Sequence, residues 1–123
     1  MKKLKLVFPY PPSELLPNKH THWSVKAKAA REAREQGYYA ILEQRGTTDK
    51  PQLKSVALDI TWYPPKGKVS DHDGLLSASK SYLDSLVDSG IIIDDSPKVI
   101  KLVSLHVGDK GDRPRTEIII REV

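Results

Sequence analysis

Hydrophobic and polar residues alternate along two short segments of the chain, residues 3–8 and 56–63, which is the pattern of β-strands that bury one face. The clearest alternation runs over residues 56–63, in which Leu58 and Ile60 fall on the same side. Prolines and glycine-rich turns bound the other segments. The predicted strands are residues 3–8, 56–63, 98–107 and 115–122.

Two longer segments repeat their hydrophobic residues at the spacing of an α-helix. The first spans residues 22–44, and its small residues form a face that we expect to pack closely on a sheet. The second begins near Leu75 and ends near Gly90. The predicted buried stripes are Trp23, Ala27, Ala30, Ala33, Gly37 and Ile41 in the first helix, and Leu75, Ser79, Tyr82 and Leu86 in the second.

These elements follow one another in the order β-α-β-α-β-β, without an internal repeat or a linker. A chain of 123 residues has the size of one domain and can bury a real core. We therefore predict a single small domain over residues 1–123. Its class is α+β, with a mixed β-sheet packed against two helices.

The charge balance favours an anionic partner. Twenty Lys and Arg residues against sixteen Asp and Glu residues give a net charge of +4 and a pI near 9.3. The absence of cysteine excludes disulfides and thiolate metal sites, and it is typical of a reducing compartment. The apolar run near the start is short and ends at prolines, so it does not predict a secretory signal. We expect a cytoplasmic protein with no membrane association.

Two aspartates, Asp71 and Asp73, stand next to Gly74 where the second helix is expected to begin. One interpretation is structural, because Ser70 and Asp73 have the S-x-x-D spacing of a helix capping box. Calcium binding in an EF-hand loop is excluded by register. With Gly74 at the sixth loop position, the first and twelfth positions carry no acidic residue.

A third interpretation is enzymatic, because D-x-D-G also resembles the nucleophile motif of haloacid-dehalogenase-type phosphatases. That motif follows a buried parallel strand, whereas the residues before Asp71 are PPKGKVS, which does not predict such a strand. A small phosphatase of this type therefore stays as an alternative of lower weight.

A second acidic pair, Asp94 and Asp95, follows the apolar run Ile91–Ile93. Aspartate before Ser-Pro is typical of a turn. A hard divalent cation such as Mg²⁺, however, takes several oxygen ligands. If the fold brings the two acidic segments together, Asp71, Asp73 and one aspartate of the second pair would supply them.

The segment DHDGLLSASKSYLDSLVDSGIIIDDSPKVI resembles the active-site region of the RusA family of Holliday-junction resolvases, especially its phage and prophage members. The N-terminal FPYPPSELLPNKHTHW is similar to the proline-rich stretch of that family. The resemblance implies a homodimeric endonuclease of DNA recombination and repair that resolves four-way junctions by paired symmetric nicks. It also implies Mg²⁺ bound by Asp71, Asp73 and Asp95, with Lys80 as the catalytic lysine.

The sequence departs from this family pattern at two places. Gly74 stands where the family usually has asparagine, and the spacing from Asp73 to Lys80 is longer than in the compact motif. Seven residues are close to two helical turns, so Asp73 and Lys80 are still expected on one face of the helix.

Basic residues in two loops are candidates for contacts with DNA phosphates. The loops before the first helix and before the second helix carry them, and the candidates are Lys19, His20, His22, Lys26, Lys66 and Lys68. His72 is a possible further metal ligand, and His106 is expected to have a structural role. A non-catalytic DNA-binding module is a second alternative, although Asp71 and Asp73 would repel phosphate in such a module.

Overall fold

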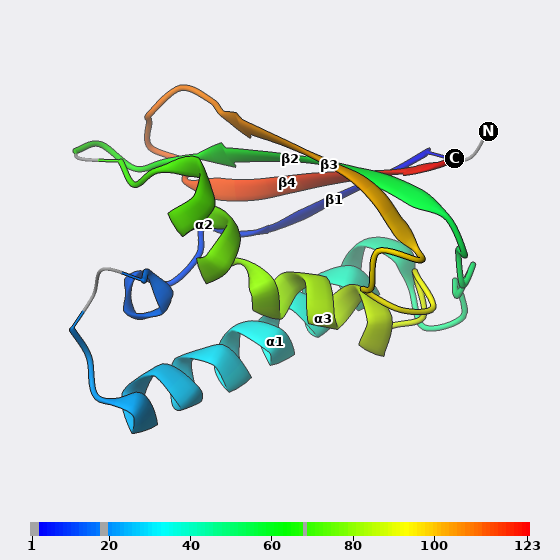
Figure 1. Ribbon diagram of the computed structural model, residues 1–123, viewed down its shortest axis with the longest axis horizontal. Helices are drawn as coiled ribbons and strands as arrows, with labels where there is room; N and C mark the ends of the chain where they lie inside the picture. The colour runs from blue at the N-terminus through cyan, green and yellow to red at the C-terminus, as the bar shows by residue number, and fades with distance from the viewer. Residues whose placement is uncertain (1–2, 18–19, 68) are drawn as a thin grey trace.

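A four-stranded β-sheet forms one layer of the molecule and helices form the other (Figure 1). The computed structural model describes residues 3–17, 20–67 and 69–123. Within these residues the strands are β1 (Lys3–Pro9), β2 (Val56–Tyr63), β3 (Ile100–Val107) and β4 (Arg115–Glu122), and the helices are the short 3-10 helix η1 (Ser13–Leu15), α1 (Trp23–Arg45), α2 (His72–Ala78) and α3 (Lys80–Asp88).

The strand order in the sheet is β1-β4-β2-β3. Strand β2 pairs in parallel with β3, while β4 pairs antiparallel with both β1 and β2. A parallel pair needs a crossover connection, and the segment with α2 and α3 supplies it. The predicted α+β class with a mixed sheet is therefore confirmed, and the strands occupy nearly the predicted segments.

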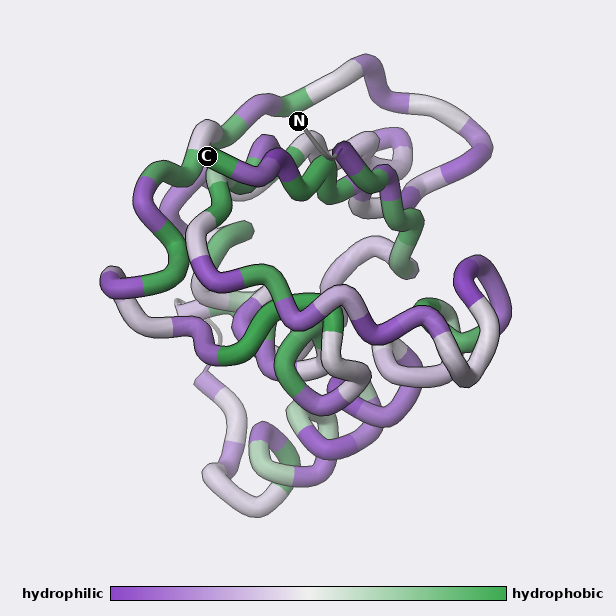
Figure 2. The backbone as a smooth tube through the Cα atoms, turned by 90° about the vertical axis from the view of Figure 1, so that its right-hand side faces the viewer, coloured by the Kyte–Doolittle hydropathy of each residue, from purple (hydrophilic) through white to green (hydrophobic). Residues whose placement is uncertain are grey.

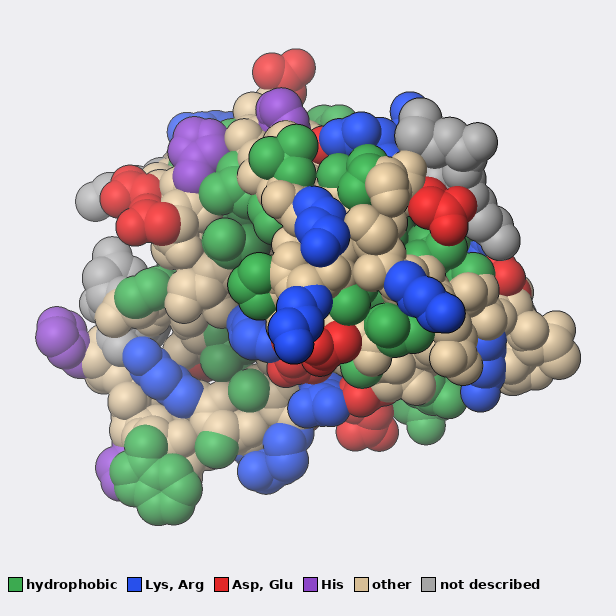
Figure 3. Space-filling view, turned by 45° about the vertical axis from the view of Figure 1, so that its right-hand side comes forward, with side chains coloured by type: hydrophobic (Ala, Val, Ile, Leu, Met, Phe, Trp, Pro, Cys, Tyr) green, Lys and Arg blue, Asp and Glu red, His purple; other side chains and the backbone are tan. Residues whose placement is uncertain are grey.

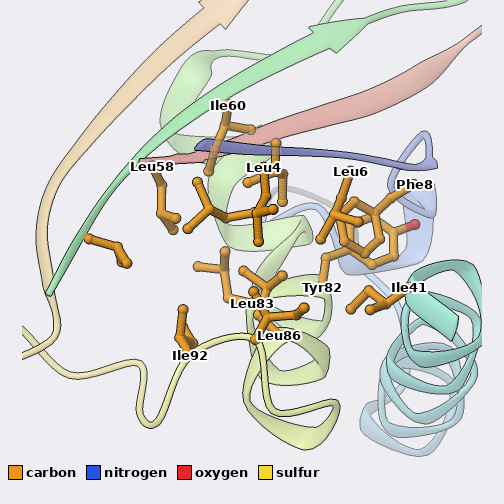
Figure 4. Packing of buried hydrophobic residues seen from close by; sticks show 14 of the residues in the cluster. Leu4, Leu6, Phe8, Ile41, Leu58, Ile60, Tyr82, Leu83, Leu86 and Ile92 are labelled. Carbon is orange, nitrogen blue, oxygen red and sulfur yellow. The ribbon is translucent and has the colours of Figure 1, made fainter. Parts of the chain in front are cut away.

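The core lies between the inner face of the sheet and the helices, where Leu58 and Ile60 meet Tyr82 and Leu86 (Figure 4). The alternation predicted for β2 is confirmed from Leu58 onward, because Leu58, Ile60 and Trp62 are fully buried and the residues between them only partly, whereas Ala57, on the opposite face, is also buried. Figure 2 shows hydrophobic and hydrophilic segments interspersed along the whole backbone. None of the described helices covers the outer face of the sheet (Figure 1).

Helix α1 begins and ends within one residue of the prediction, but its predicted buried face is wrong at the N-terminal end. Trp23 is 75% exposed, and the buried residues are Ala29, Ala33, Gly37 and Ile41. The first turns of α1 extend beyond α3, and of the described elements the short helix η1 lies beside them (Figure 1). Helical periodicity identifies a face, whereas the length of that face that is buried depends on the neighbouring element.

The predicted second helix is divided into α2 and α3 at Ser79. The buried hydroxyl of Ser79 donates to the Leu75 carbonyl oxygen at 2.8 Å and accepts from Trp62 Nε1 at 3.0 Å. A serine that bonds the carbonyl one turn earlier bends a helix. The predicted stripe of Leu75, Ser79, Tyr82 and Leu86 is nevertheless confirmed as buried.

Strand β3 begins at Ile100, two residues later than predicted. The backbone N–H groups of Val99 and Ile100 both donate to the Ser96 carbonyl oxygen, at 3.0 and 2.9 Å. These bonds close a turn, so the chain does not reach the extended conformation until after Val99. The turn also places Asp94 and Asp95 before the first residue of β3.

Candidate functional site

A pocket of about 580 Å³ lies where α2, α3 and β3 meet. Asp73 reaches it from the first turn of α2, Lys80 from the start of α3, and Asp95 from the turn before β3. The pocket lining is completed by Leu76, Ser77, Leu83, Pro97, Ile100 and Val103. Three of the four residues that the sequence predicted for catalysis therefore line one pocket, with apolar side chains around them.

The ammonium group of Lys80 lies between two carboxylates. Its Nζ donates to Asp84 Oδ1 at 2.8 Å and to Asp95 Oδ2 at 2.5 Å. Partial burial alone would lower the pKa of Lys80, but the hydrogen bonds to Asp84 and Asp95 outweigh it and raise this pKa. The hydrogen bond from Lys80 is in turn the main reason that the pKa of Asp95 is lowered. Both groups are therefore charged at neutral pH.

Asp84 is a part of this site that the sequence reasoning missed. Its second oxygen lies 3.9 Å from Arg34 Nη1 of helix α1. Arg34 also forms a two-pronged ion pair with Asp88, with distances of 2.6 Å from Nε and 2.7 Å from Nη2. The signal for Asp84 was its spacing of four residues from Lys80, which brings the two side chains together on a helix.

Asp71 lies apart from Lys80 and Asp95. It lines a second pocket of about 430 Å³, together with Asp73, Gly74 and residues 16 and 17. Asp73 borders both pockets and is the residue that joins the two parts of the predicted site. Within the described residues, no group of three or more His, Asp or Glu side chains lies close enough together to hold a metal ion.

The capping-box interpretation of Ser70 and Asp73 is wrong. Asp71, not Ser70, is the residue that caps α2 by position, and its side chain makes no capping hydrogen bond. Among the residues that the structure describes, neither Asp71 nor Asp73 has a hydrogen-bond or ion-pair partner for its carboxylate. Both side chains are exposed, so their oxygen atoms are accessible to a cation or a solvent molecule.

The two aspartates of the second pair differ in their surroundings. Asp94 is exposed and does not line the pocket, and the nearby Ser96 side chain and backbone lower its pKa. Asp95 is partly buried and reaches Lys80. The preceding run anchors this turn as expected, because Ile91 and Ile92 are buried, although Ile93 is 44% exposed.

The candidate DNA-binding residues are only partly described. His20 is exposed, and Lys66 is exposed at a loop where its Nζ lies 3.3 Å from Asp112 Oδ1. Lys19 and Lys68 lie outside the described residues. In Figure 3 the Lys and Arg side chains are spread over the visible face and several touch acidic side chains, so this face has no single continuous basic patch.

The histidines at positions 72 and 106 are both exposed. His72 is the first residue of α2 and lines neither of the two pockets that contain Asp73. His106 lies in β3 with its side chain exposed outside the core. Strand β3 is an edge strand of the sheet, which leaves most of its residues partly or fully exposed.

Comparison with known proteins identifies a relative but shows no family for this chain. No protein-family model matches the chain. An alignment over 93 residues, which covers 73% of the chain, is 33% identical to an uncharacterized protein of Xylella fastidiosa. The matched stretch covers 59% of that relative, so the chain spans less than two thirds of its length. Of the described helices, none is long and apolar enough to cross a membrane.

Proposed function

We propose that this chain is a Mg²⁺-dependent endodeoxyribonuclease that cuts four-way DNA junctions, as its resemblance to the RusA resolvases implies. The observation that carries the proposal is the meeting of Asp73, Lys80 and Asp95 at one pocket, although they come from three separate elements. Resolution of a junction needs two symmetric nicks, so the active species in this proposal is a homodimer with two such sites. A role in recombination and repair places it in the cytoplasm of a bacterial or phage-infected cell.

The donor atoms at the pocket suit Mg²⁺. This ion usually takes one or two carboxylates and completes its shell with water and substrate phosphate. Asp73 and Asp95 would supply the carboxylates, and Asp71 lies next to Asp73 at the adjoining pocket. When bound, the ion supplies activation of the attacking water and neutralises charge on the phosphate.

The remaining chemistry belongs to the side chains of the pocket. The Lys80 ammonium is charged at neutral pH and points into the pocket, so it can stabilise the negative charge that develops on a phosphodiester in the transition state. The neighbouring Leu76 and Leu83 make part of the wall apolar. An apolar wall lowers the local dielectric constant and strengthens this interaction.

The two alternatives differ in their support. A phosphatase of the haloacid-dehalogenase type needs its first aspartate at the end of a buried parallel strand. Here β2 ends at Tyr63, well before Asp71, so Asp71 does not lie at the end of that strand. A non-catalytic DNA-binding module remains the second candidate, because the exposed basic residues alone would serve it.

Cleavage assays with and without Mg²⁺ on a labelled four-way junction, a linear duplex and a generic phosphomonoester distinguish the three functions. The proposed enzyme cuts only the junction, and only with Mg²⁺.

Replacing Asp71, Asp73 or Asp95 by Asn should lower the cleavage rate by about a hundredfold or more and leave junction binding intact. Asp94→Asn is the matched control, because Asp94 is exposed beside the pocket, and it should retain a measurable fraction of activity. Full activity of Asp95→Asn would refute the proposed site.

A further inference from the structure

Lys80 is bonded to a carboxylate that the proposed metal ion would need. Its Nζ lies 2.5 Å from Asp95 Oδ2, and the same nitrogen lies 2.8 Å from Asp84 Oδ1. An ammonium group in this position neutralises Asp95 as a cation would. A dication on the same oxygen would repel the ammonium group, so the two cations cannot both occupy this place.

We propose that Lys80 is an internal cation that competes with the divalent metal ion for Asp95, and that Asp84 is the positioning residue that keeps the ammonium group at the pocket when the metal ion takes Asp95. This inference rests on the proposed function, because it assumes that Asp95 binds metal. It adds a role for Asp84 and a thermodynamic link between Lys80 and metal binding.

The helix makes the exchange a short movement. Lys80 and Asp84 are four residues apart on α3, so their side chains stay in contact on one helical face whether or not Asp95 binds a metal ion. The lysine side chain has a flexible four-carbon stem, and 60% of it is exposed. Lys80 can therefore release Asp95, keep its bond to Asp84 and still reach a phosphate in the same pocket.

Asp84 is itself restrained from the opposite side. Arg34 of α1 lies 3.9 Å from its second oxygen, and the orientation of Arg34 is fixed by the close ion pair with Asp88. The carboxylate of Asp84 thus has a cation on each side. This arrangement limits how far Asp84 can follow Lys80, so that the ammonium group stays beside the pocket.

Metal titration in the absence of DNA tests the competition. Isothermal calorimetry with Mg²⁺, or a spin-relaxation titration with Mn²⁺, gives the dissociation constant for the wild type and for Lys80→Gln. Loss of the internal cation should tighten metal binding about fivefold, the size expected when one exposed ion pair no longer has to be broken. Lys98→Gln removes the same charge from an exposed position three residues after Asp95, and it should change the constant by less than about twofold.

The outcomes separate this inference from the proposed function. If Lys80→Gln binds metal no more tightly than Lys98→Gln, while the wild type still binds Mg²⁺ and cuts junctions, only the competition is refuted. If the wild type binds neither Mg²⁺ nor Mn²⁺ at millimolar concentration, the metal-dependent function and the inference both fail.

A double-mutant cycle on cleavage tests the role of Asp84. At saturating Mg²⁺, Asp84→Asn should lower the cleavage rate about tenfold without changing junction affinity. In the Lys80→Gln background the same change should have little further effect, because the lysine it positions is gone. Asp49→Asn is the matched control, since it breaks an ion pair of the same spacing with Arg45 that contacts neither Lys80 nor Asp84, and it should cut at the wild-type rate. Equal losses in Asp84→Asn and Asp49→Asn, or full additivity with Lys80→Gln, would refute the positioning role.

Discussion

The contact between α1 and α3 requires a glycine at position 37, and Gly37→Ala should therefore destabilise the protein. A methyl group there would lie 2.6 Å from Ser85 Oγ, 3.1 Å from Ser85 Cβ and 3.2 Å from Tyr82 Cδ1. Ser85 is fully buried, and its hydroxyl donates to the Tyr82 carbonyl oxygen at 2.6 Å. The serine cannot turn away without losing this bond, so the added methyl group forces the helices apart.

Two opposing effects set the size of the loss. Overpacking a close contact costs about 1–3 kcal/mol, while alanine in a helix interior is about 1 kcal/mol better than glycine. Because the two nearest atoms both belong to a buried and hydrogen-bonded serine, we expect the upper half of the first range. The free energy of unfolding should fall by about 1–2 kcal/mol, which lowers Tm by about 4–8 °C in a chain of this size.

Gly74→Ala supplies a matched control for the same substitution in a helix. A methyl group at Gly74 would lie no closer than 3.8 Å to Pro17 Cδ and 4.0 Å to Ser70 Cβ. Only the gain in helix propensity remains there, so this variant should be more stable than the wild type by up to about 1 kcal/mol. Urea unfolding followed by circular dichroism measures both. Equal stability of Gly37→Ala and Gly74→Ala would show that α1 and α3 do not pack as closely as described.

Two further predictions concern polar contacts. Arg34 lowers the pKa of Asp88, so the ion pair stabilises the fold above the ordinary pKa of aspartate and ceases to do so as pH falls through the lowered pKa. Urea unfolding from pH 7 to pH 2 should therefore show Asp88→Asn less stable than the wild type by about 0.5–1 kcal/mol at pH 7 and no less stable at pH 2. Ser79→Ala leaves the buried Trp62 Nε1 without its partner, so it should cost about 1–3 kcal/mol in the same assay, and a cost below about 0.5 kcal/mol would contradict the described contact.

The sequence was sufficient to predict those elements whose hydrophobic pattern follows directly from which face is buried. Alternation over residues 56–63 corresponds to β2 because a strand in a sheet with one covered face has a period of two. It was insufficient where a distant residue decides the structure. The division between α2 and α3 depends on the bond of Ser79 to Trp62 in β2, which no local pattern contains. The exposure of Trp23 depends in the same way on where the partners of α1 end.

The candidate site was predictable to a similar extent. Asp73, Lys80 and Asp95 were singled out by residue type and by resemblance to a family, and they line one pocket. Asp71 belongs to the adjoining pocket instead, because its position at the start of α2 places it ahead of the helical turn that carries Asp73. Asp84 was missed because a lysine and an aspartate four residues apart are a common surface pair on helices.

The break at Ser79 links the fold to the chemistry of the site. Lys80 is the first residue of α3, so its direction follows α3 and not the axis of α2 that carries Asp73. In a single straight helix, Lys80 and Asp73 would be separated by nearly two turns along one axis. With the bend, Lys80 forms a hydrogen bond with Asp95 in the turn before β3. Lys80 and Asp73 still line the same pocket. The spacing between Asp73 and Lys80, longer than in the compact family motif, is thus compatible with a shared site. The Ser79 hydroxyl, which bonds Trp62 and Leu75, changes the direction of the helix at the residue before Lys80.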